Sequence, residues 1–226
     1  MFRIEFLLTK KPDKDWLTRI LYSAVAHGIR LNAGKFEGRY RIIPEDITKE
    51  IVRAETGNIE RTEKLADATD AYCSFDPSST ELSIMSTYVE AEPELPCSIG
   101  ITPHGSNYRL SVGTNRSDIE NASHRNQFLD LPIALFERFD FAYAASRIGE
   151  QEYVPSTTGT IEEDYPRSVT FYPRQVVEDL GRETMLSSPA ADIRELDDGS
   201  VFMLASSEPG GRRESIQSIR DHFERE

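Results

Sequence analysis

The sequence is poor in the residues that usually build metal centres or disulfide frameworks. Its 226 residues include only two cysteines, Cys73 and Cys97, and four histidines. Both cysteines lie in apolar, strand-like contexts, so we expect two buried thiols, and a bond between them is left open. No histidine has another three or four residues away, so the spacing predicts neither a metal site nor a bound cofactor.

Lysine is absent after Lys64, and the charge is unevenly distributed. Residues 65–226 hold 13 arginines and 29 acidic residues, a net charge of -16, whereas residues 1–64 carry a net +3. The absence of lysine reflects either chance, including an arginine-favouring genome, or adaptation to high salt. A chain with a net charge of -13 repels phosphate backbones and anionic membrane surfaces. We therefore expect neither nucleic acid nor membrane as a partner.

Long apolar runs and catalytic signatures are also missing. No apolar run approaches the roughly 18 residues of a membrane-spanning helix. The N-terminal apolar stretch contains Glu5 and lacks a small-residue cleavage site, so it predicts a first strand over 2–9 and a cytoplasmic protein. The sequence has no Gly-x-Ser-x-Gly elbow and no Gly-rich phosphate-binding turn, so no catalytic residue is predicted.

Hydrophobic periodicity predicts an α+β fold in which an antiparallel β-meander is flanked by helices. Helical spacing favours a helix from Pro12 to about Gly28 and another over 126–139, whose regular part would start near Pro132. Two short helices are expected within 44–68. Runs rich in Tyr, Ile, Val, Ser and Thr, separated by Pro- and Gly-containing turns, predict strands over 39–43, 71–75, 81–91, 97–102 and 107–113. Residues 141–145 are expected to form a short strand or an extended segment.

The last part of the chain predicts a β-α-α-β-β-α unit. Asp197-Asp198-Gly199 separates two apolar runs, and Asp-Gly in that setting is a strong hairpin signal. Pro173 and Gly181 are typical of a helix start and a helix end. The expected strands cover 168–172, 192–196 and 200–205, and the expected helices cover 173–180, 182–186 and 213–223.

The predicted organisation has three parts: an N-terminal α+β region over 1–148, an irregular acidic loop or linker over 149–167, and the C-terminal unit over 168–226, packed on the first region as one compact protein. Long irregular segments are often functional. Tyr143 flanks this segment and is a further candidate for partner contact. The segment's own candidate contact residues are Tyr153, Glu162, Glu163, Asp164 and Tyr165.

Several short motifs of the C-terminal part suggest a family resemblance. They are Phe171-Tyr172-Pro173-Arg174, Leu180-Gly181-Arg182, Pro189-Ala190 and Asp197-Asp198-Gly199. In these motifs the chain resembles a group of uncharacterised prokaryotic proteins, many of them haloarchaeal, and is similar to the immunity-protein-52-like α+β family. The resemblance implies a protein that neutralises a neighbouring toxin by binding it, and it assigns no catalytic residue.

Three functional hypotheses remain. The first is a non-enzymatic protein-binding module of immunity or antitoxin type whose protein partner is basic, and the acidic composition favours it. The second is a structural or assembly subunit that forms a homo-oligomer. The third is an enzyme whose site is assembled only in the fold.

Overall fold

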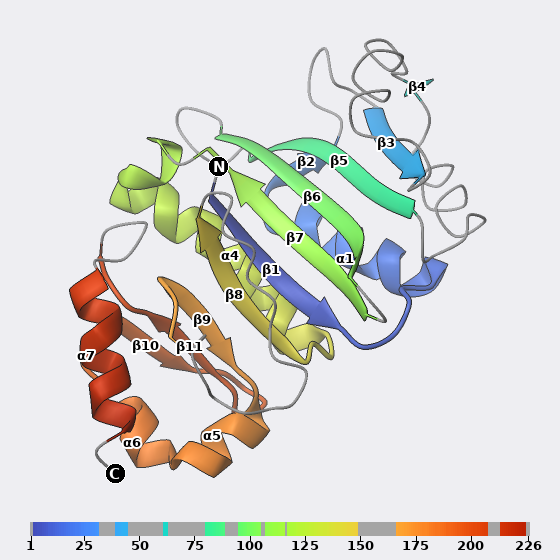
Figure 1. Ribbon diagram of the computed structural model, residues 1–226. Helices are drawn as coiled ribbons and strands as arrows, with labels where there is room; N and C mark the ends of the chain where they lie inside the picture. Colours follow the sequence, from blue (N-terminus) through green and yellow to red (C-terminus); the bar gives the residue numbers. More distant parts are fainter. Residues whose placement is uncertain are drawn as a thin grey trace. The chain divides into compact units, whose positions relative to one another are not determined.

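The computed structural model describes the first strand and helix, the central strands and most of the C-terminal third (Figure 1). The described residues are 2–31, 39–44, 61–62, 80–88, 95–104, 107–115, 117–148, 166–207 and 213–224. The chain forms two compact units, one made of Met1–Leu7 and Asn115–Glu226 and the other of Leu8–Thr114. The predicted region 1–148 therefore contributes to both units. The predicted linker, 149–167, lies outside the described residues except for its last two.

The second unit contains the predicted meander. Strands β5 (Thr80–Tyr88), β6 (Leu95–His104) and β7 (Asn107–Thr114) follow one another and pair antiparallel. Helix α1 (Lys14–Ala26) begins where Asp13 Oδ1 accepts a hydrogen bond of 2.7 Å from the Trp16 N–H. Helical spacing predicts an apolar face of Trp16, Leu17, Ile20, Leu21 and Ala24; the last four are buried, and Trp16 is half-buried.

Three short strands complete the second unit. Both β2 (Ile29–Leu31) and β3 (Arg39–Pro44) pair with β5, and β4 (Arg61–Thr62) pairs with β3. The sequence did not predict β2. The prediction of helices within 44–68 is wrong at Arg61–Thr62, which form strand β4. The rest of that stretch, and the strand expected over 71–75, lie outside the described residues.

The first unit joins the start of the chain to its second half. Strand β1 (Phe2–Leu8) pairs antiparallel with β8 (Tyr143–Ile148), with Phe2 opposite Ile148. Beyond β8 the strand order continues through β9 (Val169–Tyr172) and β11 (Val201–Leu204) to β10 (Asp192–Glu195). All of these pairs are antiparallel.

Helix α4 (Ala122–Arg138) begins ten residues before the regular start that the sequence predicted. It follows a short 3-10 turn, Ser117–Glu120, and its N-cap is Asn121, whose Oδ1 accepts from the N–H groups of Ser123 (2.8 Å) and His124 (3.3 Å). Pro132 lies in the helix interior rather than its first turn, and is buried. The capping bond and the burial of neighbouring apolar side chains outweigh the hydrogen bond that proline removes.

The predicted β-α-α-β-β-α order is confirmed. Helices α5 (Arg174–Leu180) and α6 (Arg182–Leu186) lie between β9 and β10, and α7 (Arg213–Phe223) follows β11. The hairpin closes on Gly199 at φ +83°, where the Gly199 N–H bonds to the Leu196 carbonyl and the Leu196 N–H bonds to the Ser200 carbonyl, both at 2.9 Å. A residue with positive φ after a tight turn is typical of three-residue hairpin loops, which explains the glycine.

Adjacent residues of β9 show how this sheet is covered on both faces. The Phe171 ring lies 4.9 Å from the ring of Phe136 on α4, and the Tyr172 ring lies 6.1 Å from the ring of Phe223 on α7. Because successive strand side chains point to opposite faces, α4 covers one face and α7 the other. Tyr172 belongs to the core cluster on the α7 side, together with Val177, Met185, Val201, Met203, Ala205 and Ile219.

Candidate protein-interaction surface

The contact residues predicted from the sequence, Tyr153, Glu162, Glu163, Asp164 and Tyr165, lie outside the described residues and stay predictions. Tyr143 was a wrong candidate for partner contact. Its side chain is 3% exposed and packs with Leu7 and Ala145 in the core.

Two of the described histidines contact backbone carbonyl oxygens. His27 Nδ1 lies 2.8 Å from the Ser23 carbonyl oxygen, and His222 Nε2 lies 2.9 Å from that of Thr184. Ser187 Oγ is 3.4 Å from His222 Nε2, which resembles a Ser–His dyad. A carbonyl oxygen only accepts, so Nε2 carries the proton and cannot take one from Ser187. Within the described ranges, no three His, Cys, Asp or Glu side chains are placed to hold a metal ion.

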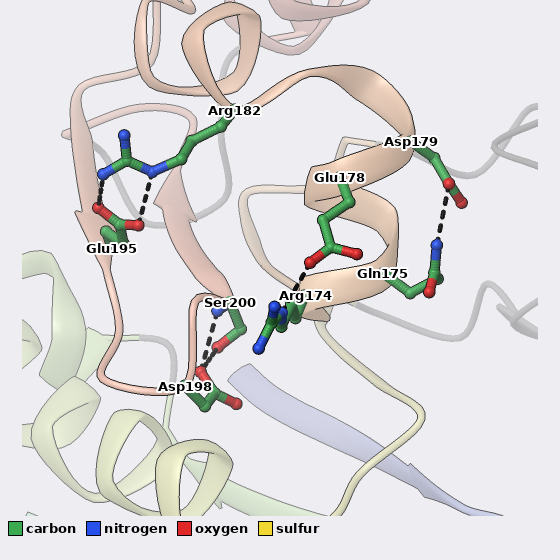
Figure 2. Close-up of polar contacts among 8 residues, drawn as sticks. All are labelled: Arg174, Gln175, Glu178, Asp179, Arg182, Glu195, Asp198 and Ser200. Atoms are coloured by element: carbon green, nitrogen blue, oxygen red, sulfur yellow. Dashed lines mark hydrogen bonds and ion pairs between the residues drawn. The ribbon is translucent and has the colours of Figure 1, made fainter.

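Carboxylates dominate the surface around α5, α6 and the β10–β11 hairpin. Residues 174–198 contain seven acidic residues, three arginines and no lysine, a net charge of -4. We call the exposed carboxylates here the acidic surface, and they are Glu178, Asp179, Glu183, Glu195, Asp197 and Asp198. Figure 2 shows four of them with their polar partners.

The α5 side chains form pairs one helical turn apart. Arg174 Nε donates to Glu178 Oε1 at 2.7 Å, and Gln175 Nε2 donates to Asp179 Oδ1 at 3.0 Å (Figure 2). The hydrogen bond to Glu178, and then the charge of Glu178, raise the pKa of Arg174. The Arg174 and Glu178 side chains are 70% and 52% exposed, so this pair contributes little to stability.

The hairpin turn uses one of its carboxylates structurally. Asp198 Oδ1 accepts from the backbone N–H of Ser200 at 2.9 Å, and also from the Ser200 hydroxyl. The sequence had indicated turn chemistry for this aspartate, and the contact confirms it. Asp197 is exposed beside it, at the tip of the hairpin.

A bidentate ion pair joins α6 to β10. Arg182 Nε donates to Glu195 Oε1 at 2.7 Å, and Arg182 Nη2 donates to Glu195 Oε2 (Figure 2). These hydrogen bonds, more than the charge of Arg182 itself, lower the pKa of Glu195 below its usual 4.5. Bidentate arginine–carboxylate geometry fixes orientation as well as charge.

The sequence offered Asp197-Asp198 as a possible acidic contact and as turn chemistry, but it did not place a surface on α5, α6 and the hairpin together, although part of that surface was readable. The Arg174–Glu178 and Gln175–Asp179 pairs follow the i, i+4 spacing of a helix face. The Arg182–Glu195 pair joins residues thirteen positions apart, and no local spacing reveals it.

Comparison of the chain with protein-family models, with curated proteins and with solved structures finds no match. Among the described residues, no helix combines the length and apolar character needed to cross a membrane.

Proposed function

We propose that this protein is a non-enzymatic, cytoplasmic binding module of the immunity type, which neutralises a basic protein partner by binding it. The observation that carries the proposal is the acidic surface: six exposed carboxylates on α5, α6 and one hairpin. The resemblance of the C-terminal motifs to immunity-protein-52-like proteins supports the same function.

The acidic surface suits a basic partner for two physical reasons. An excess of one charge sign accelerates and orients association with a surface of the opposite sign. Carboxylates also accept bidentate hydrogen bonds from arginine, which dominates tight charged interfaces. Because exposed pairs such as Arg174–Glu178 are worth little within the chain, a partner's arginine can replace Arg174 at small cost.

Binding to a neighbouring gene product tests this function. A toxin-like protein encoded beside this chain is to be titrated with the full chain by calorimetry, and growth is to be scored on co-expression. We expect binding that weakens with salt and growth that is restored. The function is wrong if the chain neither binds nor neutralises any neighbouring gene product.

Charge reversal tests the surface. The double variant Glu183→Lys with Asp197→Lys replaces two exposed carboxylates whose side chains make no hydrogen bond or ion pair within the described part of the chain, although the charge of Glu183 acts on Arg182. We expect at least about tenfold weaker binding and a smaller salt dependence. Asp130→Lys with Glu137→Lys, the same charge change at two exposed positions of α4, is the matched control and should bind as the unaltered chain does. If the Glu183→Lys, Asp197→Lys variant and the control bind equally well, the partner binds outside the acidic surface.

A further inference from the structure

Strand β10 lies at the edge of the sheet in its unit. The strand order ends at β10, and among the described residues β11 is the one strand that pairs with it. The Leu196 N–H bonds to the Ser200 carbonyl, so the backbone groups of Leu196 point toward β11. Because this direction alternates along a strand, the N–H and C=O groups of Arg194 and Asp192 also point toward β11. The N–H and C=O groups of Ile193 and Glu195 therefore point to the open side of the strand.

The side chains of β10 place opposite charges on either side of Ile193. Ile193 packs against the core cluster on the α7 side. Asp192 and Arg194 lie on the other face, where Arg194 Nη2 is 2.8 Å from Asp192 Oδ2. The Asp192 side chain is 36% exposed and the Arg194 side chain 42% exposed. The Arg194 guanidinium also lies over the ring of Phe202, its cross-strand partner on β11, 5.4 Å from the ring centre.

An identical strand placed antiparallel on this open side can adopt only a few two-fold registers. Outward-pointing residues must lie opposite one another, so the axis passes beside Ile193, Arg194 or Glu195. The Arg194 register sets two arginines opposite each other, and the Glu195 register sets two glutamates opposite each other. The Ile193 register sets each Arg194 opposite Asp192 of the second copy. Like charges directly opposite destabilise a strand pair, and opposite charges stabilise it.

We infer that two copies of this chain associate through antiparallel β10–β10 pairing about a two-fold axis at Ile193. The Ile193 N–H and C=O groups of each copy bond to those of the other, and two Arg194–Asp192 pairs flank them. The interface is isologous, so it closes at a dimer and does not propagate into fibres. The inference is independent of the proposed function, because Asp192, Ile193 and Arg194 are not part of the acidic surface.

A charge-swap cycle followed by analytical ultracentrifugation tests the pairing, over a concentration series reaching about 1 mM because the contact is short. We expect a reversible monomer–dimer equilibrium for the unaltered chain. Asp192→Arg sets arginine opposite arginine and Arg194→Asp sets aspartate opposite aspartate, so each should weaken the dimer about tenfold. The double variant restores opposite charges in the same register and should recover the dimer. Glu120→Lys, at an exposed position outside β10, should leave the equilibrium unchanged.

A backbone variant provides a second measurement. Ile193→Pro removes the outward N–H group but no hydrogen bond to β11, so dimers should be lost while circular dichroism retains the sheet signal. The inference is overturned if the unaltered chain stays monomeric throughout, or if neither single charge variant weakens the dimer. If the chain is monomeric and Ile193→Pro also abolishes binding to the basic partner, the edge of β10 binds that partner instead of a second copy.

Discussion

Replacing Phe171 by alanine should lower the free energy of unfolding by about 3–5 kcal/mol. The Phe171 side chain is 0% exposed, and its ring centre lies 4.9 Å from that of Phe136, 5.2 Å from that of Phe202 and 6.0 Å from that of Phe6. Each such aromatic pair is worth about 0.5–1.5 kcal/mol beyond area burial, and the cavity left behind adds to the loss. These contacts come from β1, α4 and β11, so the change loosens several elements of the unit together.

Urea unfolding followed by circular dichroism measures this effect. With a dependence of about 2 kcal/mol per molar urea, a loss of about 4 kcal/mol moves the midpoint down by about 2 M. Tyr22→Ala is the matched control, because Tyr22 is 71% exposed and its truncation should change stability by no more than about 0.5 kcal/mol. If the Phe171 and Tyr22 variants unfold within about 1 kcal/mol of each other, the described packing around β9 is wrong.

Three further predictions concern local structure. Asn121→Ala should cost about 1 kcal/mol in urea unfolding because α4 loses its N-cap acceptor, and Asn121→Ser should recover most of that loss; equal losses would exclude the capping role. Gly199→Ala should cost about 1–2 kcal/mol from positive φ alone, since an added Cβ would lie 3.6 Å from Arg174, an ordinary contact; a neutral variant would contradict the turn geometry. Glu195→Gln should lower the melting temperature at neutral pH, because Arg182 lowers the pKa of the Glu195 carboxyl in the folded chain. That stabilisation is present above the ordinary pKa of 4.5 and disappears as pH falls through the lowered value, so the two melting curves should converge in acid, and a constant difference would contradict it.

Local signals explain which elements the sequence predicted correctly. Asp198-Gly199 specified the hairpin because a tight turn needs a residue that accepts positive φ. The start of α4 was misplaced because Pro132 was treated as a first-turn residue, whereas Asn121 provides the N-cap. Ile29–Leu31 was not predicted, because a strand of three residues has too short a pattern to recognise and exists only through its pairing with β5.

The candidate surface and the sheet edge depend on contacts that no local pattern encodes. The strand order β9, β11, β10 departs from the order along the chain, and this arrangement leaves β10 at the edge. The partnership of Arg182 with Glu195 likewise requires α6 to be packed beside that edge strand. Residue types alone indicated an acidic molecule and the local clusters 162–164 and 197–198, but not that α5, α6 and the hairpin bring their carboxylates to one surface.

The long separation between β1 and β8 affects how the protein folds as it is made. Phe2 pairs with Ile148, so β1 leaves the ribosome well before its partner, which is synthesised almost 150 residues later. At about 5–20 residues per second, that delay is roughly 7–30 seconds. During this interval the apolar side of Phe2–Leu8 lacks the β8 strand and the α4 helix of its own unit, which makes nascent chains the stage most exposed to aggregation and to chaperone capture.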